Sequence, residues 1–245
     1  MTLHLLPTRT AGAAENMAVD FLLLQRYPAA TFPRFRHYQW SRPAFTFGYS
    51  QKIDDVRNMI LGSGPNEAHG ALLPGEYDLC RRPTGGGLVD HRDDWTYALV
   101  VPRGHALEAD RAAESYRKVH ACLVEALRAQ NVAARLQPAL EADAPGPGVC
   151  FRRAEVNDVV LAASGAKIAG AAQKRNKRGL LLQGSIARLA AGAGVDWGRF
   201  GVDFAAGLAA MLGTAAVRTP WPELSEEEVG GLTENYASPE WMAHR

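Results

Sequence analysis

Cys150 and Lys167 are the two residues of this sequence whose types and neighbours favour covalent chemistry. Cys150 follows APGPGV and precedes FRR, and positive neighbours favour the thiolate, which is the nucleophilic form of cysteine. Lys167 stands in GAKIAGAAQ, where strand alternation would place it on one face with Ala169, Ala171 and Gln173. An ammonium above a floor of small side chains can hold a carbonyl oxygen. Together the two residues predict acyl transfer, whereas Lys167 taken alone is more simply a solvated hairpin lysine.

Three consecutive glycines, Gly85 to Gly87, follow RRPT and are the second unusual feature. They stand between two predicted strands, so they cannot be a domain linker. Without side chains, this backbone can approach a ligand closely or point its amides into a cavity. The spacing matches neither a P-loop nor a dinucleotide-binding fingerprint, because neither GK[ST] nor a helix pattern follows. A tight turn between strands is the alternative to a ligand-binding backbone.

Polar residues flank the triplet on both sides. Arg81 and Arg82 precede it on a predicted strand, where neighbours face opposite ways, so one can face a pocket while the other faces solvent. His91 follows it and is either a polar group of the site or a surface or internally satisfied histidine. Cys122 lies beside the apolar stripe of a predicted helix and is interpreted as a small buried residue.

Hydrophobic periodicity predicts the elements that must position these residues. Helices are predicted over 15–26 and 112–130, and strands over Phe35–Trp40, Ala44–Tyr49, 77–81, 95–102 and 179–189, with a hairpin over 156–175 that turns at Ser164–Gly165. The stretch 57–76 is rich in Gly and Pro and predicts a surface excursion. Because strands and helices alternate irregularly, an α+β fold with antiparallel or mixed sheets is favoured over regular βαβ units.

Two further details concern the predicted helices. Over 112–130, Tyr116, Val119, Leu123 and Leu127 share one apolar face. The tail from 196 is helical in pattern: Ser225 and Glu228 form a capping box, and Pro239 begins another short turn.

Composition narrows the class of protein. The chain has 245 residues, is 47% hydrophobic and 22% charged, and is long enough to bury a core as one large or two small domains. Lys+Arg 27 against Asp+Glu 26 gives a net charge of +1 and no global case for nucleic acid. No apolar run could span a bilayer, and the start lacks a signal peptide pattern. Three widely spaced cysteines without a CxxC pair favour reduced thiols in the cytoplasm over disulfides or zinc.

Four segments in this order resemble the lipoate–protein ligase A and octanoyltransferase family: ENMAVD, YQWSRPAFTFGYSQ, RRPTGGGLVDHRDDWTYAL, and NDVVLAASGAKIAGAAQKR followed by LLLQGSI. The family shares its catalytic fold with biotin–protein ligases, whose own GRGRxGR pattern is absent here. The match covers roughly residues 14–190. The resemblance implies an α+β fold with mixed, largely antiparallel sheets flanked by helices, forming a single catalytic domain over 1–245 with a short helical C-terminal tail from about 196.

The resemblance implies one of two chemistries for attaching a lipoyl or octanoyl chain to a carrier lysine. Ligases activate lipoate with ATP and Mg²⁺ as an acyl-adenylate. Octanoyltransferases take the chain from octanoyl-acyl carrier protein through an acyl-cysteine, without ATP. Both use the KIxG lysine, here Lys167, and in the cysteine/lysine octanoyltransferases the nucleophile precedes the lysine hairpin, often as Cys-Phe, as Cys150 does here. Asn157 and Asp158 instead resemble the ligase pattern, where they help to bind adenylate and metal.

These implications favour an octanoyltransferase that uses Cys150 and Lys167, with no cofactor and no metal site. An ATP- and Mg²⁺-dependent ligase is the alternative, followed by an amidotransferase between carriers or a regulatory relative without catalysis. The expected acceptor is the glycine-cleavage H protein or a lipoyl domain. The implied substrate-binding residues are Arg82, Thr84, Gly85, Gly86, Gly87, His91, Asn157, Asp158, Ala169, Gly170 and Ala171.

Some positions depart from the family pattern. Leu88 replaces a usual alanine, Asp90 an apolar residue, Arg92 an acidic residue, and Leu182 stands where a histidine often precedes Gln-Gly-Ser. The basic run Gln173–Arg178 is interpreted most simply as a solvated loop, with docking of an acidic carrier protein as the functional alternative.

Overall fold

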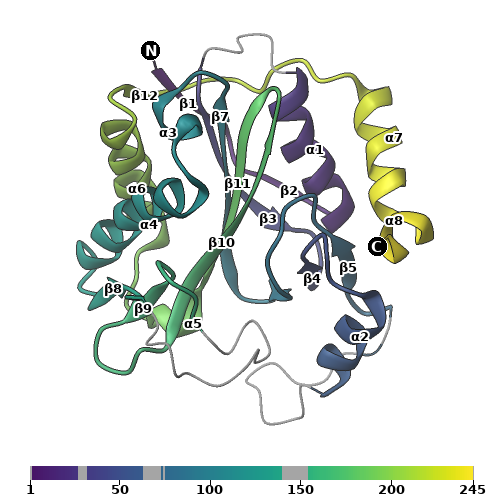
Figure 1. Cartoon of the computed structure of the whole chain (residues 1–245), viewed down its shortest axis with the longest axis horizontal. Helices are drawn as coiled ribbons and strands as arrows, with labels where there is room; N and C mark the ends of the chain where they lie inside the picture. Colours follow the sequence, from purple (N-terminus) through teal and green to yellow (C-terminus); the bar gives the residue numbers. More distant parts are fainter. Residues whose placement is uncertain (1, 27–31, 63–72, 74, 140–153, 245) are drawn as a thin grey trace.

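The computed structural model describes residues 2–26, 32–62, 73, 75–139 and 154–244. Its centre is a large mixed sheet with the strand order β12-β1-β3-β7-β11-β10-β9-β8, to which β2 adds beside β3 (Figure 1). The strands of this sheet are β1 (Thr2–Leu5), β2 (Arg9–Ala11), β3 (Arg34–Trp40), β7 (Asp94–Pro102), β8 (Ala134–Leu136), β9 (Val159–Leu161), β10 (Lys167–Asn176), β11 (Gly179–Ala187) and β12 (Ala215–Arg218). Within this large sheet, the pairs that involve β1 or β2 are parallel, and the other pairs are antiparallel.

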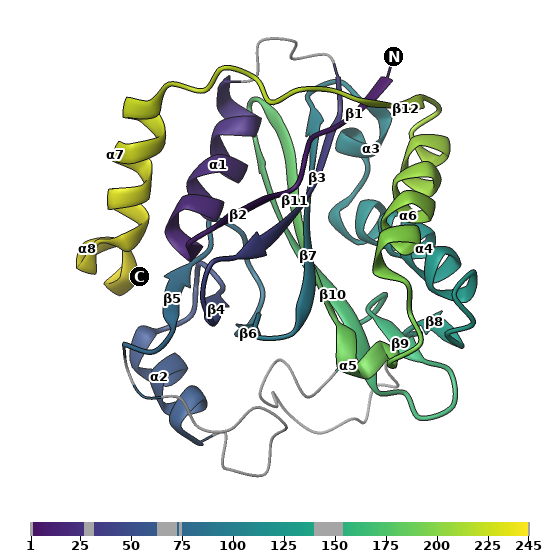
Figure 2. The same cartoon turned by 180° about the vertical axis from the view of Figure 1, so that it is seen from behind.

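Helices cover both faces of the large sheet. They are α1 (Ala13–Arg26), α2 (Ile53–Gly62), α3 (Ala106–Ala109), α4 (Ala112–Arg128), α5 (Arg188–Ala191), α6 (Trp197–Met211), α7 (Glu226–Ala237) and α8 (Pro239–Ala243). Figures 1 and 2 show α4 and α6 on one side of the sheet, and α1 with α7 on the other. The expected α+β architecture of mixed sheets flanked by helices is therefore confirmed.

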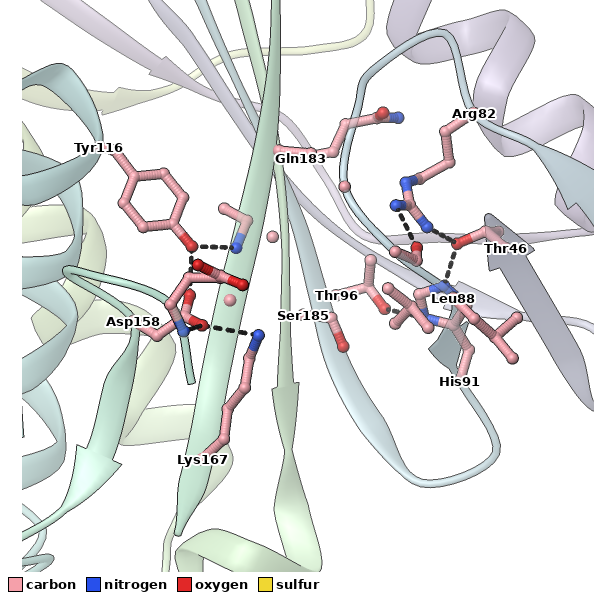
Figure 3. A pocket seen from close by; sticks show the side chains of 18 of the residues that line it. Thr46, Arg82, Leu88, His91, Thr96, Tyr116, Asp158, Lys167, Gln183 and Ser185 are labelled. Atoms are coloured by element: carbon pink, nitrogen blue, oxygen red, sulfur yellow. Dashed lines mark hydrogen bonds and ion pairs between the residues drawn. The ribbon is translucent and has the colours of Figure 1, made fainter. Parts of the chain in front are cut away.

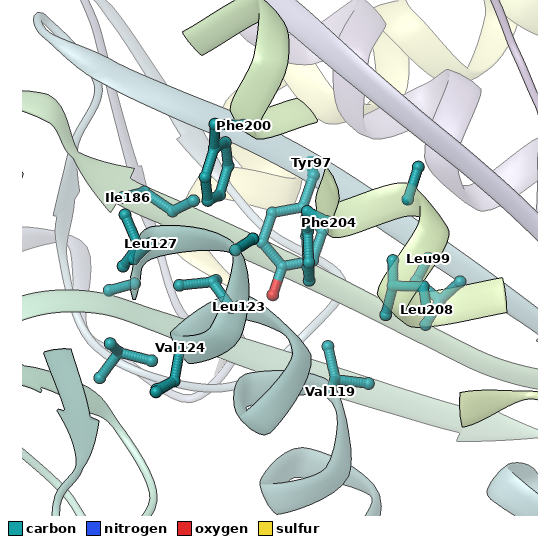
Figure 4. Close-up of a cluster of buried hydrophobic side chains, with 14 of the residues drawn as sticks. Tyr97, Leu99, Val119, Leu123, Val124, Leu127, Ile186, Phe200, Phe204 and Leu208 are labelled. Carbon is teal, nitrogen blue, oxygen red and sulfur yellow. The ribbon is translucent and has the colours of Figure 1, made fainter. Parts of the chain in front are cut away.

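The central strand β7 is buried on both faces, which explains its nearly continuous apolar sequence. Tyr97 and Leu99 point towards α4 and α6, where they contact a cluster that includes Phe204 (Figure 4). Ala98 and Val100, at the alternate positions, pack in a second cluster with α1. Because helices cover both sides, the strand lacks the polar alternation of a half-exposed strand.

A smaller sheet with the order β5-β4-β6 lies on the same side of the large sheet as α1 (Figures 1 and 2). Its strands are β4 (Ala44–Phe47), β5 (Asp78–Arg81) and β6 (Val89–Asp90). Phe45 and Phe47 pack against Val56 and Ile60 of α2 in a separate small cluster. This sheet carries the glycine triplet between β5 and β6, so it brings the triplet to the face of the large sheet.

Several expectations need correction. Helix α2 spans Ile53–Gly62, where the sequence predicted only a surface excursion from 57, and its apolar face explains the helix. The tail is not purely helical, because β12 lies within it and pairs with β1. The basic run is not a loop, since β10 extends to Asn176, and the Arg175 guanidinium turns inward to Ser115 Oγ at 2.7 Å.

Other expectations hold. The hairpin over 156–175 is confirmed, with β9 and β10 antiparallel around the predicted turn. Ser225 caps α7 by accepting a hydrogen bond from the Glu228 amide, and Pro239 begins α8. Cys122 is partly buried against the core, as interpreted. No helix in the described part of the chain is long and apolar enough to cross a membrane.

Candidate active site

A cavity of about 380 Å³ lies between the large sheet and the small one. Its volume falls in the range of roughly 300–1,000 Å³ that is usual for ligand pockets. Figure 3 shows Lys167, Asp158 and Tyr116 on one side of it, and Arg82, Thr46 and His91 on the other. Apolar side chains that include Met17, Trp40, Leu88, Val89, Val156, Ala171 and Ala172 line the space between these groups.

Lys167 forms an ion pair with Asp158, with 2.7 Å between Nζ and Oδ2. The side chain of Asp158 is 1% exposed and that of Lys167 is 16% exposed, so water screens this pair only partly. Asp158 Oδ2 also accepts the Glu155 amide at 2.7 Å, and Oδ1 accepts the Tyr116 hydroxyl. The expected apolar surroundings of Lys167 therefore include a carboxylate, that of Asp158, which was not expected from the sequence to pair with the lysine.

The face of β10 that carries Lys167 differs from the expected one. The pairing register with β9 shifts between Lys167 and Ala169, and this irregularity breaks the simple alternation of side chains. Ile168 and Ala169 both enter the core, while Gly170 faces the Lys167 ammonium. The prediction that Lys167 shares a face with Ala169 is wrong for this reason.

The glycine triplet is held in place from within. The Arg82 guanidinium donates to the carbonyl oxygens of Gly85 and Gly87 at 2.9 and 2.8 Å, and to Thr46 Oγ1 at 2.8 Å. Burial lowers the pKa of Arg82 to about 10. Gly48 lies so close that a Cβ there would come within 1.9 Å of the Gly86 oxygen. The triplet is thus a fixed wall of the cavity.

Arg81 and Arg82 are both buried, so the expectation that one faces solvent is wrong. The Arg81 guanidinium points away from the cavity and donates to the carbonyls of Trp241 and Met242 at 3.0 and 2.7 Å. The C-terminal helix α8 covers this side of β5, which removes the solvent that the alternation rule assumed.

His91 lies in a buried polar chain at the far side of the cavity. Its Nδ1 is 2.6 Å from Asp94 Oδ2, and its Nε2 is 2.7 Å from Thr46 Oγ1. Asp94 Oδ2 also accepts the hydroxyls of Ser185 and Thr96 at 2.6 and 2.7 Å. Burial raises the pKa of Asp94, but His91 and these hydrogen bonds outweigh burial and hold it below its ordinary value. His91 lines the cavity, and both of its ring nitrogens have hydrogen-bond partners. It is therefore both a polar group of the site and an internally hydrogen-bonded histidine.

The ENMAVD segment supports the closed end of the cavity. Asp20 Oδ1 pairs with Arg36 Nε at 2.6 Å, and Asp20 Oδ2 accepts Gln183 Nε2 at 2.7 Å. Gln183 Oε1 in turn accepts the Thr84 hydroxyl at 2.8 Å. A buried carboxylate with these partners fixes α1 against β3 and β11.

The structure brings together most of the residues that the sequence predicted for the site. Those that line the cavity are Arg82, Gly86, Gly87, His91, Asp158, Lys167, Gly170 and Ala171. Thr84, Gly85, Asn157 and Ala169 do not line the cavity, although each stands within two positions of a residue that does. Cys150 lies outside the described residues.

Sequence reasoning missed Tyr116, Gln183 and Thr46, which all contribute polar atoms to the cavity wall. Tyr116 was assigned to the apolar stripe of its helix, and that assignment concealed its hydroxyl. The sequence feature that could have indicated its role is a hydroxyl-bearing tyrosine at the beginning of a helix face otherwise made of Val and Leu. Gln183 and Thr46 stand at buried strand positions, where a polar side chain needs a partner.

Solved structures share this architecture. The crystal structure of lipoate-protein ligase A bound with ATP superposes with a TM-score of 0.73 at 19% identity, covering 100% of this chain and 99% of that one. A bi-partite lipoate protein ligase from Thermoplasma acidophilum gives 0.72 at 20% identity, covering 100% and 97%. At these identities the likeness defines the fold, which is that of a lipoate–protein ligase catalytic domain.

The chain belongs to the lipoyl protein ligase A/B catalytic domain family, whose model matches residues 12–188. Octanoyltransferase LipM of Bacillus cereus is 34% identical over 180 residues, which cover 71% of this chain and 60% of the relative. Octanoyltransferase LipM of Kyrpidia tusciae is 32% identical over 191 residues, covering 76% and 65%. The matched part therefore spans about 60% of the length of the first of these relatives.

Proposed function

We propose that this protein is an octanoyltransferase, which moves an octanoyl chain from octanoyl-acyl carrier protein to a carrier lysine through a thioester on Cys150. The observation that carries the proposal is the cavity between the two sheets, with the Lys167 ammonium held at one side. Similarity to relatives named octanoyltransferase LipM adds support. We propose the glycine-cleavage H protein or a lipoyl domain as acceptor, in the cytoplasm, with no nucleic acid or membrane partner.

The acyl chain would lie with its carbonyl near Lys167 and its tail among the buried residues. Val156 is 42% exposed and also lines the cavity, so it marks the open side, close to Glu155 and Asp158. Met17 and Gln183, at the other side, are 1% and 5% exposed. Cys150 precedes Ala154, where the described chain resumes beside this opening, by four positions.

The proposed transfer has two steps, acylation of Cys150 and transfer of the acyl group to the acceptor lysine. The Cys150 thiolate attacks the donor thioester carbonyl, the Lys167 ammonium donates a hydrogen bond to the oxyanion, and the carrier thiolate leaves with the electron pair of the broken C–S bond. The neutral amine of the acceptor lysine then attacks the acyl-cysteine, gives up its proton to water and releases the Cys150 thiolate with the electron pair of the broken C–S bond, while the carrier thiolate released in the first step takes up a proton from water. The product is an amide, and the enzyme returns to its initial state.

An ATP-dependent ligase is the alternative function, and Asp158 is the residue on which its metal site would depend. Both oxygens of that carboxylate already accept donors, from Tyr116, Lys167 and the Glu155 amide. The donors around Asp158 therefore fit Mg²⁺ poorly, and we derive no step through ATP or Mg²⁺. An amidotransferase would use the same Cys150 chemistry with an octanoylated or lipoylated carrier as donor.

We also take residues 1–245 as one catalytic domain with a C-terminal tail. The contacts of Arg81 with the carbonyls of Trp241 and Met242 support this, because they join the tail to a strand of the site-bearing sheet.

The test is an acyl-transfer assay without ATP. Incubation with octanoyl-acyl carrier protein should add one octanoyl group to Cys150, detected by peptide mass spectrometry, and the Cys150→Ala variant should gain none. Transfer to an apo-lipoyl domain by Cys150→Ala that requires ATP and lipoate would replace this proposal with the ligase. Acylation of the enzyme by an octanoylated lipoyl domain, but not by octanoyl-acyl carrier protein, would indicate the amidotransferase.

A further inference from the structure

The hydroxyl of Tyr116 reaches the cavity from α4, a helix on the opposite side of the large sheet from the glycine triplet (Figures 1 and 3). It donates to Asp158 Oδ1 and accepts the backbone N–H of Ala171 at 2.9 Å. Because the Ala171 amide can only donate, the single proton of the phenol points to Asp158. Burial, together with Asp158, raises the pKa of Tyr116 well above its usual value, so the phenol remains a donor at all ordinary pH values.

The Tyr116 hydroxyl oxygen accepts a backbone N–H of β10 that has no carbonyl of a neighbouring strand as its partner. The neighbouring strand β9 runs antiparallel to β10, begins only at Val159 and pairs with β10 only at Lys167 and Ala169, so Ala171 lies beyond the start of β9. The Ala171 amide, two residues further along β10, meets the Tyr116 oxygen instead of a strand carbonyl. The gap left by the short strand is what allows an α4 side chain to reach the cavity wall.

A second residue of α4, His120, contacts the segment just before β9 that contains Asn157 and Asp158. His120 stands one helical turn after Tyr116, with ring centroids 4.1 Å apart, and its Nδ1 is 2.7 Å from the Asn157 carbonyl. Asn157 has a φ of 68°, a left-handed conformation that non-glycine residues adopt only when their surroundings enforce it. Side chains of α4 therefore contact both residues: His120 binds the backbone carbonyl of Asn157, and Tyr116 binds the carboxylate of Asp158.

We propose that Tyr116 is a positioning residue, which acts through Asp158 to set where the Lys167 ammonium stands and how strongly it is held. This inference rests on the proposed function for its catalytic consequence, but the positioning itself does not. Asp158 shares its negative charge among Tyr116, Lys167 and the Glu155 amide. Removing the phenol proton leaves more of that charge to the lysine, so Lys167 binds Asp158 more tightly and is less ready to turn to an oxyanion.

The first measurement concerns Lys167 itself and needs no acyl donor. Lys167 in the intact protein is labelled with acetic anhydride at a series of pH values, and the extent is read by peptide mass spectrometry. In Tyr116→Phe the midpoint of labelling should move to higher pH than in the wild type, because the ammonium is held more tightly. The other titratable groups around the pair are Glu155 and His120, with Arg82 and His91 across the cavity, and the substitution leaves all four in place.

Tyr97→Phe is the matched control. Tyr97 is fully buried, and its hydroxyl has no hydrogen-bond partner among the described residues, so the variant removes the same atom without touching Asp158. An equal labelling midpoint in Tyr116→Phe and Tyr97→Phe would overturn the proposal. If Tyr116→Phe fails to fold by circular dichroism, 3-fluorotyrosine at position 116 retains the shape with a more acidic phenol. That replacement should move the midpoint to lower pH, and no movement would also overturn the proposal.

The second measurement is catalytic. In ATP-free octanoyl transfer, Tyr116→Phe should lower kcat roughly tenfold to a hundredfold, because misplacing a group at the reacting carbonyl has effects of that size. KM should change less than about twofold, since the acyl chain keeps its contacts. An unaltered kcat would overturn the catalytic consequence. If the wild type shows no ATP-free transfer, the proposed function fails, while the labelling midpoint of Lys167 still decides the positioning role.

Discussion

The Lys167 ammonium lies directly against the backbone of Gly170, where a Cβ would come within 2.9 Å of both Cε and Nζ. The same Cβ would lie 3.2 Å from Asp158 Oδ1. The glycine of the KIAG sequence therefore provides the space in which the lysine and the carboxylate meet. The position of the Lys167 ammonium therefore depends on the absence of a side chain at Gly170, three positions along the chain.

Gly170→Ala should displace Lys167 while leaving the fold intact. The atoms that the new methyl group would meet belong mostly to a flexible lysine, so unfolding free energy should change by less than about 1 kcal/mol. Octanoyl transfer should fall by roughly a hundredfold, because a displaced lysine no longer meets the oxyanion. Gly230→Ala, at a helix position with no atom within 4 Å of the added Cβ, serves as the control in the same assay. Full activity of Gly170→Ala would show that the lysine position is not critical.

Gly48→Ala should affect stability rather than chemistry alone. Its Cβ would lie 1.9 Å from the Gly86 oxygen, and a backbone carbonyl cannot rotate away as a side chain does. Unfolding in urea should show a loss of about 1–3 kcal/mol, the usual range for overpacking. Gly85→Ala provides the comparison, because nothing lies within 4 Å of its Cβ, and it should unfold like the wild type. Equal stability of the two variants would mean that the triplet can move away from Gly48.

His120 should make stability depend on pH. Burial lowers its pKa from 6.5 to about 4, with the Asn157 carbonyl and Asp158 opposing the shift. Below pH 6.5 the unfolded chain binds a proton that the folded chain does not, so stability is complete above that pH and falls as pH decreases towards 4. A shift of this size corresponds to roughly 3 kcal/mol.

The measurement is chemical denaturation of the wild type and His120→Gln at several pH values between 4 and 7. The difference in unfolding free energy between the two proteins should shrink as pH decreases, because the variant has no imidazole to protonate. A constant difference across this range would contradict a neutral, buried His120.

The three cysteines should differ in reactivity. Burial raises the pKa of Cys80 to about 12 and that of Cys122 to about 11, so both remain thiols at neutral pH. Iodoacetamide at pH 7 should therefore modify Cys150 first, because only the thiolate reacts at a useful rate. Peptide mapping measures the rates, and prior incubation with octanoyl-acyl carrier protein should protect Cys150. Faster labelling of Cys80 or Cys122 in the folded protein would contradict their burial.

The elements of the fold with strong periodicity were predictable from the sequence. The strand over 95–102, the helix over 112–130 and the hairpin that turns at Ser164–Gly165 all occur, because each repeats its apolar residues at the spacing of its own geometry. Strand β12 was not predictable, since its four residues are exposed and their place is decided by pairing with β1. Helix α2 was missed because Gly and Pro later in the same stretch concealed its apolar face.

By itself, the sequence determined which residues could take part in chemistry and the order in which they occur. The glycine triplet, the lysine of KIAG and Cys150 are properties of local sequence, and so is their resemblance to a family of acyl-attaching enzymes. Only the tertiary structure decided that Tyr116 serves the cavity, and that Lys167 faces Gly170 and Asp158 instead of Ala169. The physical reason is that the register shift in β10 and the start of β9 only at Val159 decide where these side chains point, and both result from pairing between strands, which periodicity within one segment does not record.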